Sequence, residues 1–144
     1  MPFFVALAVF SLDRLAKLAA LGFLRAGDPV PIVPPILKLT LVLNDGAAFG
    51  LFKGGAPFFT LISAMVIIAI SLYIVKNRPA DRLISSALGL IIGGAAGNLA
   101  DRLIIGRVVD FIDLGVWPVF NIADSCITIG TVMIIFMLLV RRPG

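Results

Sequence analysis

Residues 120–140 read FNIADSCITIGTVMIIFMLLV, in which an asparagine and an aspartate precede a long apolar run. From Cys126 to Val140 the run carries no charged residue, which is typical of a helix that crosses a membrane. An ionised Asp costs about 2.5 to 3.5 kcal/mol at the centre of a membrane helix. Asp124, at the mouth of this run, therefore indicates a residue that is paired, caps the helix or takes part in function.

The rest of the chain has the same apolar character. Its 144 residues are 60% hydrophobic, well outside the composition of soluble domains. A helix needs about 20 residues to cross a hydrocarbon core of about 30 Å. Four runs are long enough: residues 3–23, 58–75, 83–105 and 119–140. The sequence predicts an all-α membrane protein, a single domain over residues 1–144 built as a bundle of four transmembrane helices.

The connection over residues 24–57 has a different pattern. Four prolines lie between positions 29 and 35, and residues 37–43 alternate Leu with Lys38, Thr40 and Val42, as strands do. Asn44-Asp45-Gly46 is typical of a turn. We therefore predict a small β-rich segment on the outer membrane surface between the first two helices.

The basic residues predict the orientation of the bundle. Lys76, Arg78 and Arg82 crowd the short loop between the second and third runs, and arginines at 141–142 follow the fourth. Loops rich in Lys and Arg stay on the cytoplasmic side. Both termini are therefore predicted to be cytoplasmic, with the connection over residues 24–57 outside.

The composition excludes several classes of function. The chain has no His, its eight acidic residues are all Asp, and Cys126 is its single cysteine, which we interpret as a small core residue. No His or Cys cluster can hold zinc, and a Ser or Cys protease with a His base is excluded. The twelve basic residues form no stripe that would bind nucleic acid. We expect no metal and no cofactor.

Small residues follow one face of the third run. Gly89, Gly93 and Gly97 lie four residues apart, a spacing that lets another helix approach closely. One interpretation is packing inside the bundle. The other is that this face leaves room for a guest helix.

Polar residues gather where the third run ends and the fourth begins. By the predicted topology these residues share the outer membrane face, and they are Asn98, Asp101, Arg102, Asp110, Asp113, Asn121 and Asp124. Two carboxylates close together cannot both ionise easily, so one keeps a proton while the other acts as a base. Aspartic proteases activate water in this way without metal or His. The spacing alone does not decide which pair does so.

Single residues of this group also have structural interpretations. Asn121 can cap the fourth helix, with Asp124 favourably placed in its first turn. Asp101 can neutralise its neighbour Arg102 or bond to Asn98 one turn back.

Asp13 and Lys17 lie four residues apart in the first run, which favours an internal salt link. Asp13 lies close to mid-membrane, so contact with the polar group is an alternative that stays open.

Five blocks of the chain, in order, resemble the lipoprotein signal peptidases (signal peptidase II) of bacterial inner membranes. The blocks are Asp13 with Lys17, NDGAAFG at 44–50, GNLADR at 97–102, VVDFID at 108–113 and FNIADS at 120–125. The resemblance covers essentially the whole chain.

The resemblance implies an aspartyl endopeptidase that cuts the signal peptide from a diacylglyceryl-modified prolipoprotein, just before the lipidated cysteine. Block by block, it implies Asp110 and Asp124 as the catalytic dyad. It implies supporting or substrate-contacting roles for Asn44, Gly46, Ala47, Asn98, Asp101, Arg102, Asn121, Asp13 and Lys17. Membrane lipid as a partner and inhibition by cyclic peptide antibiotics follow from the family alone.

On this hypothesis the substrate's signal helix lies against the glycine face of the third run. The rival hypothesis is a small transporter that uses the same aspartates as cation or proton sites. A transporter predicts acidic residues spread through the membrane and some internal symmetry. In this chain the acidic residues gather at one face, and the two halves do not resemble each other.

Overall fold

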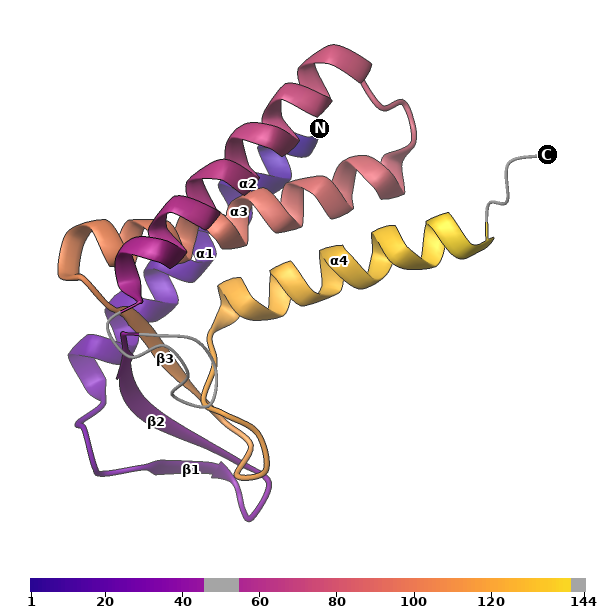
Figure 1. Ribbon diagram of the computed structural model, residues 1–144. Helices are drawn as coiled ribbons and strands as arrows, with labels where there is room; N and C mark the ends of the chain where they lie inside the picture. The colour runs from indigo at the N-terminus through magenta and orange to yellow at the C-terminus, as the bar shows by residue number, and fades with distance from the viewer. Residues whose placement is uncertain (46–54, 141–144) are drawn as a thin grey trace.

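The computed structural model describes residues 1–45 and 55–140, and these form four helices and three strands (Figure 1). The elements are α1 (Pro2–Phe23), β1 (Val30–Val33), β2 (Leu37–Asn44), α2 (Ala56–Asn77), α3 (Arg82–Ile105), β3 (Val108–Asp113) and α4 (Ile122–Val140). Each helix coincides with a predicted run. The largest difference is at the start of α4, which begins three residues later than predicted because Asn121 caps it.

The strands form one antiparallel sheet in the order β1-β2-β3, which lies beyond one end of the helices (Figure 1). The predicted strand at residues 37–43 is confirmed as β2. β3 was not predicted, because its stretch VVDFID is buried almost throughout and lacks the alternation of a half-exposed strand. The β-rich part therefore also draws on the connection between α3 and α4. Pairing sets Val42 opposite Asp110 and Lys38 opposite Asp113.

Helix α3 is the centre of the bundle and packs against α1, α2 and α4. An apolar cluster of Ala6, Ile74, Leu88 and Ile92 joins α1, α2 and α3. α2 and α4 lie on either side of α3 and barely contact each other (Figure 1). The bundle is therefore closed on the α1 side and open between α2 and α4.

The glycines of α3 account for its close contact with two neighbours. A Cβ atom on Gly93 would lie 2.6 Å from the carbonyl oxygen of Ala6 in α1, and one on Gly94 would lie 2.5 Å from that of Ala123 in α4. Both distances are far below van der Waals contact, so only glycine fits. The packing interpretation is confirmed. The expectation of a guest helix on this face is wrong, because α1 already fills it.

The outer surface of the helices is apolar. Phe4, Leu72, Phe136 and Leu138 are all more than 60% exposed, which a soluble bundle would not tolerate over such an area. Within the described residues, α2, α3 and α4 are long and apolar enough to cross a membrane. The chain is thus a multi-pass membrane protein.

We expect Gly93→Ala to destabilise the bundle, because the added methyl group forces α1 away from α3. A loss of about 1 to 3 kcal/mol is typical of such overpacking. Thermal unfolding in detergent measures it. Gly22→Ala is the matched control, since a Cβ on Gly22 of α1 would meet nothing within 4 Å. Equal stability of the two variants would contradict the close-packing argument.

Candidate active site

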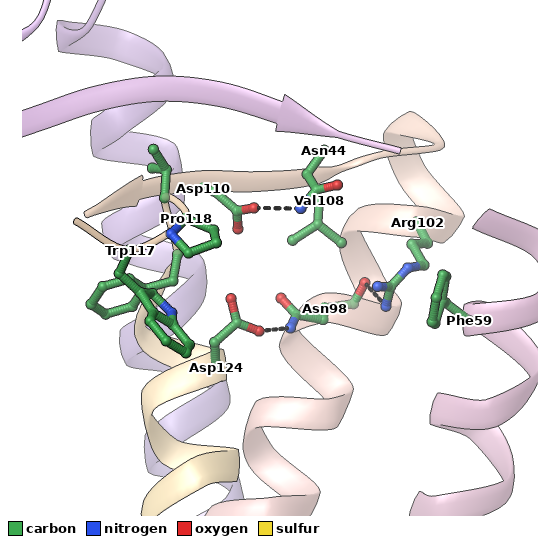
Figure 2. A pocket seen from close by; sticks show the side chains of 11 residues that line it. Asn44, Phe59, Asn98, Arg102, Val108, Asp110, Trp117, Pro118 and Asp124 are labelled. Carbon is green, nitrogen blue, oxygen red and sulfur yellow. Dashed lines mark hydrogen bonds between the residues drawn. The ribbon is translucent and has the colours of Figure 1, made fainter. Parts of the chain in front are cut away.

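A polar cavity of about 230 Å³ lies where the ends of α3 and α4 meet the sheet. Its volume can hold several water molecules at about 30 Å³ each. Figure 2 shows the side chains that line it, which are Asn44, Phe59, Asn98, Arg102, Val108, Asp110, Trp117, Pro118, Val119, Phe120 and Asp124. Among the predicted site residues, Asn44, Asn98, Arg102, Asp110 and Asp124 thus line one cavity.

Asp110 and Asp124 reach this cavity from different elements and both point into it (Figure 2). Asp110 sits in β3 and is 2% exposed. Its Oδ2 accepts a hydrogen bond of 3.0 Å from Asn44 Nδ2, and its Oδ1 one of 2.7 Å from Asn121 Nδ2. Strand pairing between β2 and β3 is what brings Asn44 beside it.

Asp124 sits in the first turn of α4, where it forms a reciprocal cap with Asn121. Asn121 Oδ1 accepts from the Asp124 backbone N–H at 2.9 Å, and Asp124 Oδ2 accepts from the Asn121 backbone N–H at 3.3 Å. Asn98 Nδ2 donates to Asp124 Oδ1 at 2.8 Å. The capping interpretation is confirmed, and it coexists with a position in the cavity.

Asn121 therefore contacts both carboxyl groups at once. Its side-chain nitrogen donates to the Asp110 carboxyl group, and its backbone N–H donates to that of Asp124. Its side-chain oxygen accepts from the Asp124 backbone N–H and so holds the first turn of α4. The side chain is fully buried, so a loss of either partner would leave a polar group without water. Asn121 sets the position of one carboxyl group relative to the other.

Burial raises the pKa of Asp110 to about 7. Removal from water disfavours the charged form; the Asn44 hydrogen bond lowers the pKa, and the nearby Asp124 raises it. Near neutral pH Asp110 thus exchanges a proton readily. A carboxyl group with such a pKa is suited to acid–base chemistry.

A buried ionic cluster lies beneath the cavity. Lys17 Nζ is 2.8 Å from each of Asp13 Oδ2, Asp101 Oδ2 and Asn98 Oδ1, and both Lys17 and Asp13 are fully buried. The predicted Asp13–Lys17 link is confirmed as an ion pair, although it lacks the alignment of a hydrogen bond. Asp13 Oδ1 also accepts from the Ala123 backbone N–H at 2.9 Å. Asp13 therefore reaches the start of α4.

Asp101 joins this cluster to the sheet. Its Oδ1 pairs with Arg14, and its Oδ2 accepts from the Val109 backbone N–H at 3.1 Å. The alternatives in which Asp101 neutralises Arg102 or bonds to Asn98 are wrong, because α1 supplies its cations. Arg102 instead lies over the Phe59 ring at 5.6 Å and approaches Ser63 Oγ at 3.5 Å.

Some candidates lie elsewhere. Asp113 does not line the cavity. Its Oδ2 accepts a hydrogen bond from Thr40 Oγ1 at 2.8 Å and lies 3.3 Å from Lys38 Nζ. Gly46 and Ala47 lie outside the described residues. Sequence reasoning missed the aromatic lining, which is Phe59, Trp117 and Phe120. Aromatic residues are common in such apolar sequence, so no local signal distinguishes these three.

The arrangement can exchange protons but offers little to a metal ion. In the described ranges 1–45 and 55–140, no three His, Cys, Asp or Glu residues are grouped as metal ligands. Each oxygen of Asp110 and Asp124 accepts one N–H, and both side chains line the cavity. Two carboxyl groups held in this way can act on a water molecule as base and acid.

Comparison with known proteins gives consistent matches over the whole chain. The family described as "Signal peptidase (SPase) II" matches residues 5–140. A lipoprotein signal peptidase of Halothermothrix orenii is 41% identical over 96% of this chain and 94% of its own length. One of Desulfitobacterium hafniense is 42% identical over 92% of this chain and 89% of its own length. A solved bacterial membrane enzyme superposes with a TM-score of 0.91 at 33% identity, covering 99% of this chain and 92% of its own.

Proposed function

The chain belongs to the signal peptidase II family, and we propose that it removes signal peptides from diacylglyceryl-modified prolipoproteins with Asp110 and Asp124 as its catalytic pair. Family membership decides for an aspartic peptidase over the rival transporter hypothesis. The observation that supports the catalytic pair is that Asn121 joins the two carboxyl groups at the wall of one cavity.

The two aspartates take different parts in the reaction. Asp110, whose pKa is about 7, starts protonated and donates to the oxygen of the scissile carbonyl. Asp124, whose two oxygens accept N–H groups, takes a proton from the attacking water. The tetrahedral intermediate then breaks at its C–N bond, and the amine leaves with the proton that Asp124 received. Asp110 regains its proton as the carbonyl re-forms.

All four helices cross the membrane. α1 is 22 residues long, about 33 Å at 1.5 Å per residue. Its charged residues Asp13 and Lys17 are buried against α3 instead of facing lipid, so they do not prevent insertion. The start of α1, the α2–α3 loop and the end of α4 lie at the end away from the sheet (Figure 1).

The active site lies at the outer face of the bacterial inner membrane. Lys76, Arg78 and Arg82 gather near the loop at the other end of the bundle, which the positive-inside rule places in the cytoplasm. Water and a lipidated peptide can both reach the cavity from outside. Membrane lipid as a partner and inhibition by cyclic peptide antibiotics are expected from the family.

The signal helix occupies the opening between α2 and α4. An apolar hollow of about 420 Å³ lies there, walled by Ala69, Tyr73, Leu88, Met137 and others. Tyr73 is fourteen residues from Phe59 at the cavity, about 21 Å along α2. That length suits the apolar part of a signal peptide, about 7 to 15 residues.

We expect Asp110→Asn and Asp124→Asn each to lower kcat at least about 10²-fold, because each removes a group that must exchange a proton. A gel-shift assay of a diacylglyceryl-modified prolipoprotein, in detergent without added metal, measures cleavage. Asp113→Asn is the control, since Asp113 lies on the same strand but pairs with Thr40 and Lys38. Cleavage by all variants at the wild-type rate would refute the catalytic pair.

We expect kcat/KM to fall as the pH rises through about 7, because Asp110 then loses the proton that it donates. Asn44→Leu removes an N–H donor that stabilises the charged carboxylate, so the pKa rises and this limb moves to higher pH. A pH–rate profile between about pH 5 and 9 measures both effects. A flat profile, or an unmoved limb in Asn44→Leu, would contradict the assignment of Asp110 as the acid.

We expect Ala69→Trp to raise KM about tenfold, because the indole fills the hollow that the signal helix would occupy. The substrate then loses more than about 1 kcal/mol of packing against the enzyme. Steady-state kinetics with the same substrate measures it. Ile68→Trp is the matched control, because Ile68 is 59% exposed and does not line the hollow. If both tryptophans leave KM unchanged, the signal helix binds elsewhere.

A further inference from the structure

We propose that Lys17 is a positioning residue for catalysis, which orients the Asn98 amide so that its NH2 group faces Asp124. The inference rests on the proposed catalytic pair. It concerns a lysine in α1 that does not line the cavity and is not used in the chemical steps above.

The ammonium group of Lys17 is surrounded by three oxygen atoms, and it donates a hydrogen bond to Asn98. Lys17 is 0% exposed, and its Nζ lies 2.8 Å from three oxygen atoms, one each from Asp13, Asp101 and Asn98. An ammonium group has three N–H donors and no acceptor. All three donors therefore have an oxygen atom within reach, and two of these oxygens carry negative charge. Lys17 is held in one position.

The position of Lys17 decides which way the Asn98 amide faces. The oxygen and nitrogen of an amide have nearly the same shape, so the neighbours determine its orientation. Because Lys17 can only donate, the atom of Asn98 that faces it must be the oxygen. Asn121 Nδ2 also donates to that oxygen at 3.1 Å. The NH2 group of Asn98 is left to face Asp124 Oδ1, at 2.8 Å.

This orientation matters for the part that Asp124 takes in the reaction. Its Oδ1 accepts from Asn98 and its Oδ2 from the Asn121 backbone N–H, so each carboxyl oxygen is held in place by one N–H donor. If the Asn98 amide were reversed, its carbonyl oxygen would face the carboxylate oxygen. Two acceptor oxygens would then face each other without a hydrogen bond, and Asp124 would lose the contact that holds its carboxyl group in position.

Arg14 offers an internal comparison. It pairs with Asp101 in the same cluster and carries the same charge as Lys17. Within residues 1–45 and 55–140, Arg14 forms neither a hydrogen bond nor an ion pair with Asn98 or Asp124. A purely electrostatic or structural role of the cluster would be shared by both cations. Of these two cations, it is Lys17 that donates to Asn98.

The test compares Lys17→Met, Lys17→Gln and Arg14→Gln in the prolipoprotein cleavage assay, with kcat and KM measured separately. We expect Lys17→Met to lower kcat about tenfold or more, with KM within about twofold, because it frees the Asn98 amide to turn. Lys17→Gln restores an N–H donor without the charge and should recover much of the loss. Arg14→Gln should stay within about threefold of wild type, since Asn98 is untouched.

Folding is checked by thermal unfolding of each purified variant. Lys17→Met leaves Asp13 without its cation and can therefore prevent folding. In that case the double variant Lys17→Met/Asp13→Asn, which removes both charges, is assayed in place of Lys17→Met. Asp13→Asn alone is its control. A folded Lys17 variant with wild-type kcat would overturn the inference. So would an equal loss in Arg14→Gln, or a Lys17→Gln variant as slow as Lys17→Met.

Failure of the inference is distinguishable from failure of the proposed function. Asp124→Asn is assayed beside the Lys17 variants as the inactive reference. If Asp124→Asn cleaves normally, the catalytic pair itself is wrong. If Asp124→Asn is inactive while folded Lys17→Met cleaves at the wild-type rate, the pair stands and only the positioning role is lost.

Discussion

Lipid cannot solvate a charge, so the charged residues of a membrane bundle must be neutralised within the protein. Here the ammonium group of Lys17, surrounded by oxygens of Asp13, Asp101 and Asn98, provides that neutralisation. The same contacts join α1 to α3, and Asp13 reaches the backbone at the start of α4. The ionic cluster that neutralises the buried charges of α1 thus also connects this helix to the end of the bundle where Asp110 and Asp124 lie.

Two asparagines connect this ionic cluster to Asp110 and Asp124 by hydrogen bonds. Asn98 accepts a hydrogen bond from Lys17 and donates one to Asp124, while Asn121 caps α4 and donates a hydrogen bond to Asp110. Amides can donate and accept at the same time, which neither a carboxylate nor an ammonium group can do. They therefore transmit orientation from the buried charges to the two aspartates without adding charge of their own. The cap of α4 and the positions of Asp110 and Asp124 thus depend on one set of hydrogen bonds.

The glycines determine which faces of α3 the other helices occupy. Because Gly93 and Gly94 let α1 and α4 approach α3 to backbone contact, those faces of α3 are occupied. The remaining face opens between α2 and α4, where the apolar hollow lies, and the cavity that holds Asp110 and Asp124 lies near the sheet. It is this open face that the proposed binding of the signal helix uses. The close fit at the glycines of α3 therefore determines which of its faces α1 and α4 cover and which face stays open.

Much about this protein could be read from local patterns, since the hydrophobic runs mark the four helices and alternation marks β2. The blocks that contain Asp110 and Asp124 likewise stand out, because carboxylates are rare in such apolar sequence. Local patterns could not show β3, whose burial on both faces removes the alternation, nor that Asp101 pairs with α1 instead of with its neighbour Arg102. They also left open which helix fills the glycine face. Those outcomes depend on which groups meet across the bundle, and only the tertiary structure determines that, because a buried charge pairs with the nearest partner in space and not in sequence.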